Sequence, residues 1–139
     1  MIWEPRPTPV VTGDTERYWE AAADGELLVN ECPDCGHVYH YPRPVCPECF
    51  GDDVEWVEAD GTGEVYTYAV VTNPDIIPDF PEEAFPHILA FVELDEGPRV
   101  LTNLVDTDPA DVEIGSRVEA RFEDTDDEDV GIPVFVLDE

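Results

Sequence analysis

The sequence predicts a mainly β protein with an N-terminal helix, a small metal-binding module and a five-stranded barrel. Two Cys-x-x-Cys pairs stand ten residues apart in the first half of the chain. From residue 64 onward, runs rich in branched and aromatic residues alternate with turn signals, as in all-β domains. We expect three parts: an arm and helix over 1–25, the metal-binding module over 26–58, and the barrel over 59–139.

The first part combines an extended arm with one helix. Three prolines among the first nine residues favour an extended backbone. Asp14 is placed to cap a helix over 15–23, which a following Asp-Gly pair ends. The helix carries an aromatic pair, Tyr18 and Trp19. These rings either pack only on the chain's own ribbon or barrel or also contact a partner protein.

The cysteines of the second part have the spacing of a single metal site. Each pair can form a tight turn with both sulfurs on one side, and two facing turns complete a tetrahedral thiolate cage. Gly36 and Gly51 follow the pairs, where a positive φ would help the turns. A redox-active iron centre of rubredoxin type and disulfides are the alternatives. The expected ligands are Cys32, Cys35, Cys46 and Cys49.

Short β runs over 26–30, 38–41 and 54–57 surround the cysteine pairs. A strand that feeds the first pair and a hairpin that leads to the second are the layout of a rubredoxin-like zinc ribbon. His37 and His40 flank the first pair, but four thiolates already saturate a tetrahedral ion. We therefore expect both histidines either on the surface or next to the metal ligands without binding the ion.

Five β runs in the third part indicate a small closed barrel. A hairpin turn over 95–98 separates the second run from the third, and one helical turn over 108–112 separates the third from the fourth. A helix at that point is typical of an OB-fold. The expected strands are 64–72, 88–94, 100–105, 117–122 and 134–137.

Several other motifs do not predict a functional site. The acidic run over 123–129 lacks the glycine that a calcium loop needs at its sixth position, so we expect a solvated loop. Gly61-Thr62-Gly63 precedes a strand and no helix, which predicts a bend and not a phosphate-binding loop. His87 has no nucleophile motif nearby. No catalytic residue is predicted.

The charge balance predicts a halophile's cytoplasmic protein. Six basic residues, all arginine, stand against 35 acidic ones and give a net charge of −29. Self-repulsion of this size destabilises a compact state. Molar salt screens the repulsion, because it shortens the Debye length to about 3 Å. The 42% of hydrophobic residues argues against a disordered acidic tail. The longest apolar run, 88–92, is too short to cross a bilayer, and a reducing cytosol favours metal binding over disulfides.

A ribbon beside an OB-fold would ordinarily suggest a nucleic-acid binder. The charge argues against that function, because only six arginines can face phosphates and molar salt removes the gain from counterion release. A nucleic-acid-binding module is kept as the alternative function.

The assembled pattern resembles a known family. It combines a helix with Tyr18-Trp19-Glu20, the four-cysteine ribbon, and barrel segments over 61–68, 94–104 and 114–118. This combination is similar to the zinc-ribbon OB-fold proteins, long described as a domain of unknown function, that accompany thiolases. The resemblance covers the chain from about residue 14 to its C-terminus.

The resemblance implies a structural zinc ion and a non-enzymatic subunit. In archaeal members such a protein bridges acetoacetyl-CoA thiolase and 3-hydroxy-3-methylglutaryl-CoA (HMG-CoA) synthase. These enzymes are thus the implied partners, and holding or channelling acyl-CoA is the implied task. Arg43 and Arg99 are candidates for a CoA phosphate, with ion pairs to neighbouring carboxylates as the alternative. No firm CoA-binding residue follows from the resemblance.

Overall fold

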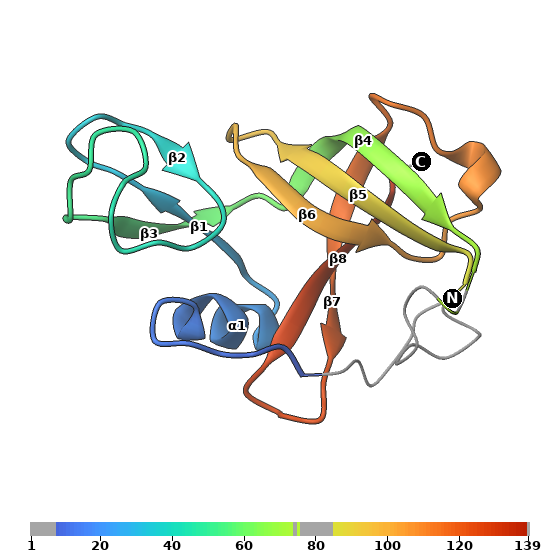
Figure 1. Ribbon diagram of the computed structural model, residues 1–139, viewed down its shortest axis with the longest axis horizontal. Coiled ribbons are helices and arrows are strands. Elements are labelled where there is room, and N and C mark those ends of the chain that lie inside the picture. The colour runs from blue at the N-terminus through green and yellow to red at the C-terminus, as the bar shows by residue number, and fades with distance from the viewer. Residues whose placement is uncertain (1–7, 74, 76–84, 139) are drawn as a thin grey trace.

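The computed structural model describes residues 8–73, 75 and 85–138, and it confirms the predicted fold class. One helix, α1 (Glu16–Ala23), precedes a three-stranded sheet and a closed five-stranded barrel. Figure 1 shows the small sheet at one end of the molecule, the barrel at the other, and α1 beneath the connection between them. No helix within these residues is long and apolar enough to cross a membrane.

The small sheet holds the cysteine turns. Its strands are β1 (Leu27–Glu31), β2 (Val38–Tyr39) and β3 (Glu55–Ala59), in the antiparallel order β2-β1-β3. Asn30 on the central strand is buried, and its amide tethers two neighbours. Its Oδ1 accepts a hydrogen bond from Arg43 N at 3.2 Å, and its Nδ2 donates one to Glu55 O at 3.4 Å. The Asn30 side chain therefore holds the segment before the second cysteine pair against the sheet.

The barrel closes in the order β4-β5-β6-β8-β7, with β7 paired to β4 and β6 parallel to β8. A 3-10 helix, η3 (Pro109–Asp111), lies between β6 and β7, where an OB-fold has its helix. Asp108 caps η3 by accepting a hydrogen bond from Ala110 N at 2.9 Å. The barrel strands are β4 (Thr62–Val71), β5 (His87–Leu94), β6 (Arg99–Leu104), β7 (Arg117–Asp124) and β8 (Gly131–Leu137).

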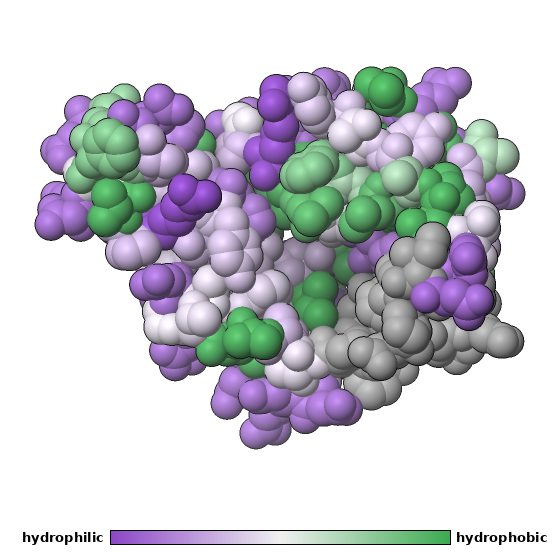
Figure 2. Space-filling view, viewed as in Figure 1, coloured by the Kyte–Doolittle hydropathy of each residue, from purple (hydrophilic) through white to green (hydrophobic). Residues whose placement is uncertain are grey.

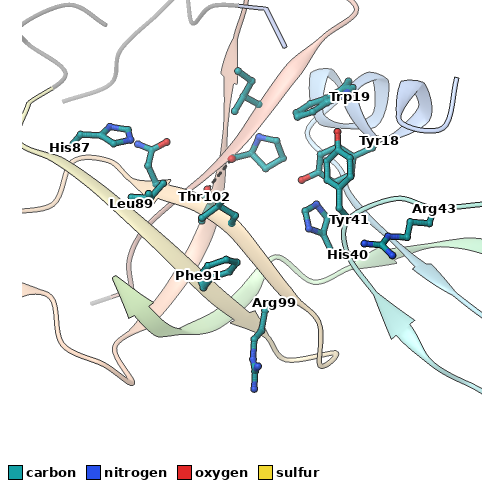
Figure 3. Close-up of a pocket in the computed structure, with 14 residues that line it drawn as sticks. Tyr18, Trp19, His40, Tyr41, Arg43, His87, Leu89, Phe91, Arg99 and Thr102 are labelled. Atoms are coloured by element: carbon teal, nitrogen blue, oxygen red, sulfur yellow. Dashed lines mark hydrogen bonds between the residues drawn. The ribbon is translucent and has the colours of Figure 1, made fainter. Parts of the chain in front are cut away.

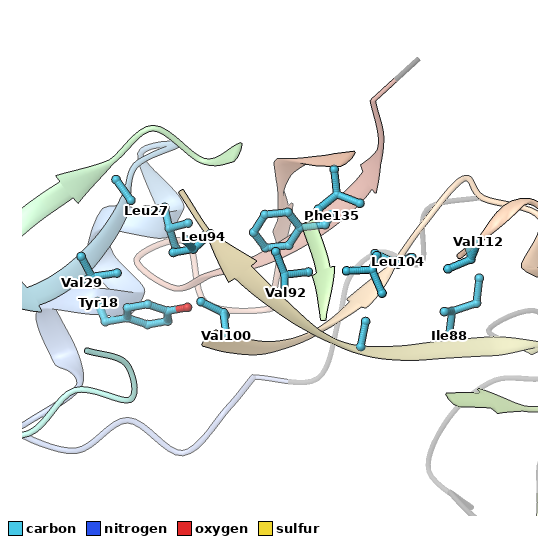
Figure 4. Packing of buried hydrophobic residues seen from close by; sticks show 14 residues of the cluster. Tyr18, Leu27, Val29, Ile88, Val92, Leu94, Val100, Leu104, Val112 and Phe135 are labelled. Carbon is cyan, nitrogen blue, oxygen red and sulfur yellow. The ribbon is translucent and has the colours of Figure 1, made fainter. Parts of the chain in front are cut away.

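One hydrophobic core serves the helix, the small sheet and the barrel. Inward residues such as Val92 and Phe135 fill the barrel and are fully buried. The same cluster includes Tyr18, Leu27 and Val29, which come from α1 and β1. Figure 4 shows these three side chains at one end of the barrel core. The small sheet is thus attached to the barrel by shared apolar burial.

The helix begins one residue later than predicted. Thr15, and not Asp14, is the N-cap, and it makes no side-chain cap hydrogen bond. Its buried hydroxyl instead accepts a hydrogen bond from Thr12 N at 3.1 Å. The Thr15 hydroxyl, which could cap the helix, is therefore used by the turn that precedes the helix. Most of the predicted extended arm lies outside the described residues.

Two barrel segments also differ from expectation. Gly63 belongs to β4, where it pairs with Leu94 and Val118, and a side chain there would collide with the backbone of β5. The glycine thus permits close strand approach, and only Gly61 has the positive φ of a bend. The acidic run is not wholly a loop, because Glu123 pairs within β7 and is 1% exposed. The acids over 126–129 are exposed, as predicted.

Candidate functional site

The four cysteine sulfurs converge on one point between the two turns. All lie within 4.8 Å of one another, with Cys32 Sγ 3.5 Å from Cys49 Sγ and Cys35 Sγ 3.7 Å from Cys46 Sγ. Zinc–sulfur bonds of about 2.3 Å in a tetrahedron place the sulfurs about 3.8 Å apart. None of the chain's four cysteines forms a disulfide. The donor set and its spacing therefore fit a structural zinc ion.

The two turns are built alike. Cys32 N donates to His37 O, and Gly36 N donates to Cys32 O at 2.7 Å. The second turn repeats both bonds, from Cys46 N to Gly51 O and from Phe50 N to Cys46 O, each at 2.9 Å. Repetition of one local geometry is what brings the two sulfur pairs face to face.

The second turn corrects the predicted role of Gly51. Phe50, and not Gly51, occupies the positive-φ position that Gly36 occupies in the first turn, at φ 62° against 77°. Gly51 instead lies close to the metal-site residues, because a Cβ there would be 3.0 Å from the Asp34 carboxylate and 3.4 Å from Cys49 Sγ. A small side chain at position 51 would therefore require the Asp34 carboxylate to shift by a few tenths of an ångström.

The thiols hold their protons unequally. Burial opposes ionisation of Cys46, but hydrogen bonds from the backbone of Cys49 and Glu48 lower the pKa of its thiol to about 7. A backbone hydrogen bond at His37 favours the Cys35 thiolate, yet desolvation and the neighbouring thiols raise its pKa to about 12. A divalent ion would have to displace these protons, so metal affinity should weaken as the pH is lowered.

A cleft of about 600 Å³ lies beside this module, between α1, the segment after β2, and the outer face of β5 and β6 (Figure 3). Tyr18 and Trp19 line it from the helix, and His40, Tyr41 and Arg43 line it from the ribbon. Barrel strands supply apolar walls on the other side. Among the described residues that line the cleft, none is acidic, although the chain has 35 Asp and Glu.

Aromatic rings form the helix side of the cleft. The Tyr18 ring lies 4.9 Å from that of Trp19 and 5.2 Å from that of His40. Burial lowers the pKa of His40 to about 4, so its imidazole is neutral at physiological pH. Trp19 Nε1 and His40 Nε2 are buried and have no hydrogen-bond partner among the described residues. Such atoms are rare in folded proteins and indicate a missing partner.

The two candidate arginines differ in what they contact. Arg99 Nε lies 3.1 Å from Glu93 Oε2, and its guanidinium stands 3.8 Å from the centre of the Tyr66 ring. This is the ion pair that the sequence left as the alternative. Within the described part of the chain, the Arg43 guanidinium forms no ion pair. Figure 3 shows Arg43 directed towards His40 and Arg99 extending away from the cleft.

The other two histidines also have structural surroundings. His37 stacks on Tyr39, with ring centres 5.6 Å apart, and His87 is buried at the start of β5. The sulfur cluster includes neither His37 nor His40. His87 lines the far end of the cleft.

An exposed apolar face on β5 and β6 continues from the cleft. Leu89, Phe91 and Leu101 are 40%, 41% and 54% exposed, and Phe91 pairs directly with Leu101. Figure 2 shows hydrophobic side chains gathered over these strands. Sequence reasoning missed this face. Its signal was the unbroken apolar run over 88–92, because an antiparallel strand with one solvated face should alternate.

Comparison with known proteins gives matches to both structural parts. The family described as "ChsH2, rubredoxin-like zinc ribbon domain" matches residues 19–55, and "ChsH2, C-terminal OB-fold domain" matches residues 56–123. A DUF35 domain-containing scaffold protein from Methanocaldococcus jannaschii is 38% identical over 117 residues, which cover 80% of this chain and 81% of the relative.

Two further relatives carry enzyme names. A probable enoyl-CoA hydratase alpha subunit from Thermomonospora curvata is 40% identical over 94% of this chain, which spans only 39% of that relative's length. The solved structure of an Ltp2-ChsH2(DUF35) aldolase is similar with a TM-score of 0.80 and 39% identity, over 93% of this chain and 98% of the matched chain.

Proposed function

This chain belongs to the DUF35 family of zinc-ribbon OB-fold proteins, and we propose that it is a non-catalytic adaptor subunit of an acyl-CoA-processing enzyme complex. The observation that carries this proposal is the exposed apolar face of Leu89, Phe91 and Leu101. In a chain with a net charge of −29, an apolar face that lines a cleft with no acidic residue among its described lining residues is suited to contact with another protein.

The proposed partners are a thiolase-type enzyme and HMG-CoA synthase, which is what the family resemblance implies. One adaptor that binds both enzymes raises the local concentration of the second near the product of the first. The scaffold, hydratase-subunit and aldolase names of the relatives support a role beside an acyl-CoA enzyme.

The proposed cofactor site consists of Cys32, Cys35, Cys46 and Cys49, which bind one structural zinc ion. Zinc does no chemistry on a substrate in this proposal. Its binding free energy would stabilise the two turns, and the ribbon residues His40, Tyr41 and Arg43 would then be held against α1 and the barrel.

The test is co-purification in molar KCl with thiolase and HMG-CoA synthase from the same source. Leu101→Asp places a charge on the apolar face and should reduce recovery of the complex at least about tenfold, in line with loss of an interface anchor. Ile114→Asp is the matched control, because Ile114 is 71% exposed and does not line the cleft. Equal recovery of wild type and Leu101→Asp, or no recovery with either enzyme, would refute the proposal.

A nucleic-acid-binding module remains the second candidate, because Tyr66 and Phe91 are exposed aromatic residues on an OB-fold barrel. Oligonucleotide retained by the chain in molar KCl, with no binding of either enzyme, would favour it.

A further inference from the structure

We infer that the cleft contains an open strand edge, at which β6 pairs with an extended segment of the partner enzyme as an additional strand. The edge is the side of β6 that faces β8, over residues 99–101. This inference rests on the proposed function, because it names the part of the partner that the adaptor binds. Main-chain hydrogen bonds would then add to the apolar contacts of Leu89, Phe91 and Leu101.

The first argument is how little of β6 pairs with β8. Among the described residues these two strands pair only at Leu104 and Phe135, next to a hydrogen bond from Val105 N to Phe135 O at 2.9 Å. By contrast, β5 pairs with β6 along its whole length. Over 99–101, β6 therefore has a paired neighbour on one side only within the described part of the chain.

Pro133 explains why the pairing with β8 stops. Two residues before the Leu104–Phe135 pair, a continued parallel ladder would place Pro133 beside Thr102. The N–H of residue 133 would then donate to Leu101 O, but proline has no N–H. The Thr102 hydroxyl instead donates to Pro133 O at 3.1 Å. The ladder is therefore interrupted at Pro133, as expected for proline at a sheet edge.

The second argument is the direction of the main-chain groups on β6. Residue pairs of an antiparallel ladder alternate between hydrogen-bonded and non-hydrogen-bonded. Leu94 N donates to Pro98 O at 2.9 Å, so the even-numbered residues of β6 bond to β5. Arg99 and Leu101 therefore direct their N–H and C=O groups away from β5. The bond from Val105 N to β8 agrees, because residue 105 is also odd-numbered.

The third argument is the lining of the cleft. Leu101, Thr102 and Asn103 are consecutive on a strand, so their side chains point alternately to opposite faces. All three nevertheless line the cleft, and so do the consecutive residues Ile132 and Pro133 of β8. The cleft therefore lies between the edges of β6 and β8. Figure 1 shows β6 at the border of the barrel that faces α1.

The fourth argument concerns the chemistry of the occupant. Unpaired N–H and C=O groups at an edge are a template for another strand. Side chains on one face of an added strand would extend the apolar face of Phe91 and Leu101, and those on the other face would lie against Ile132. A short apolar segment fits this surrounding. A second copy of this chain is disfavoured, because each copy carries a net charge of −29.

The experiment is hydrogen exchange at single-amide resolution, read by mass spectrometry with electron-transfer fragmentation. The full zinc-loaded chain is measured in molar KCl, alone and with the thiolase or HMG-CoA synthase that co-purifies with it. In the free chain the Leu101 amide should exchange nearly as fast as in an unfolded chain, whereas the amides of Val100 and Thr102 should be protected by β5. In the complex the Leu101 amide should become protected as well.

A pair of variants at one position separates the main chain from the side chain. Leu101→Pro removes the N–H that points to the open edge, and proline is tolerated at such a position. Leu101→Ala is the matched control, because it shortens the side chain and keeps the N–H. Calorimetric titration with the same enzyme should show that Leu101→Pro binds about 3- to 10-fold more weakly than Leu101→Ala, in line with one lost hydrogen bond. Circular dichroism shows whether each variant is folded, and the exchange measurement needs no variant.

The outcomes separate this inference from the adaptor proposal. An enzyme that binds while the Leu101 amide still exchanges fast, or that binds folded Leu101→Pro and Leu101→Ala equally, would overturn the inference and leave the adaptor role intact. Protection of the Leu101 amide in the free chain would overturn it too, because the edge would already be covered. Loss of that protection on dilution would identify a second copy as the occupant. Binding of neither enzyme would overturn both proposals.

Discussion

Loss of zinc should unfold the cysteine turns and leave β1 in place. The perturbation is Cys46→Ser, which removes one proposed zinc ligand, a side chain that is fully buried in the sulfur cluster. Structural zinc contributes about 10–16 kcal/mol in small zinc modules, which is comparable to the whole stability of an ordinary domain. Within the two turns little apolar burial replaces the metal, because Cys35, Cys49 and Phe50 are exposed.

The first strand of the sheet has independent support. Leu27, Leu28 and Val29 are at most 6% exposed, and burial of each contributes about 1.5–3 kcal/mol. Leu27 and Val29 belong to the same core as the barrel residues. Unfolding should therefore stop short of the whole predicted module over 26–58 and involve mainly residues between β1 and β3.

Hydrogen exchange read by mass spectrometry tests this prediction, with Val45→Ser, an exposed neighbour, as the control. In Cys46→Ser, or after chelation, the amides of Gly36 and Phe50 should exchange as in an unfolded chain, while those of β1 and β5 keep their protection. Re-addition of zinc should restore the wild-type turns. Protection of the turns without zinc, or equal loss across β1 and β5, would refute the reasoning.

Three further predictions concern salt, pH and backbone strain. With a net charge of −29, circular dichroism should show unfolding on dialysis from molar KCl into low salt, and an unchanged spectrum would contradict halophilic stabilisation. Hydrogen bonds from Arg117 and Thr62 lower the pKa of Asp95 to about 2. The contribution of this carboxylate to stability is therefore present above its unfolded pKa of about 3.9 and is lost as the pH falls towards 2. The Tm difference between wild type and Asp95→Asn should shrink between pH 5 and 2, and a constant difference would argue against a stabilising Asp95–Arg117 pair. Phe50→Gly relieves a positive φ of 62° at a side chain that is 78% exposed, so it should raise the free energy of unfolding of the zinc-loaded protein by about 1 kcal/mol. A lower Tm would contradict this.

The sequence could predict the metal site because its determinants are local. Cys32 and Cys35 lie within one turn of the chain, as do Cys46 and Cys49, so their spacing sets the direction of each sulfur pair. Local signals also predicted the barrel strands, since branched runs and turn residues act over a few positions. They failed for Gly63 and Glu123, where pairing with a neighbouring strand decides whether a residue belongs to a strand or a loop.

The sequence by itself determined the four-cysteine cluster, the order of helix, ribbon and barrel, and the net charge of −29. Only the tertiary structure decided that Trp19, His40 and Arg43 line one cleft together with Phe91. It also decided that Arg99 pairs with Glu93 and that Arg43 stays unpaired among the described residues. The physical reason is range: backbone turns and strand runs follow from adjacent residues, whereas a cleft depends on how distant elements pack on a common core.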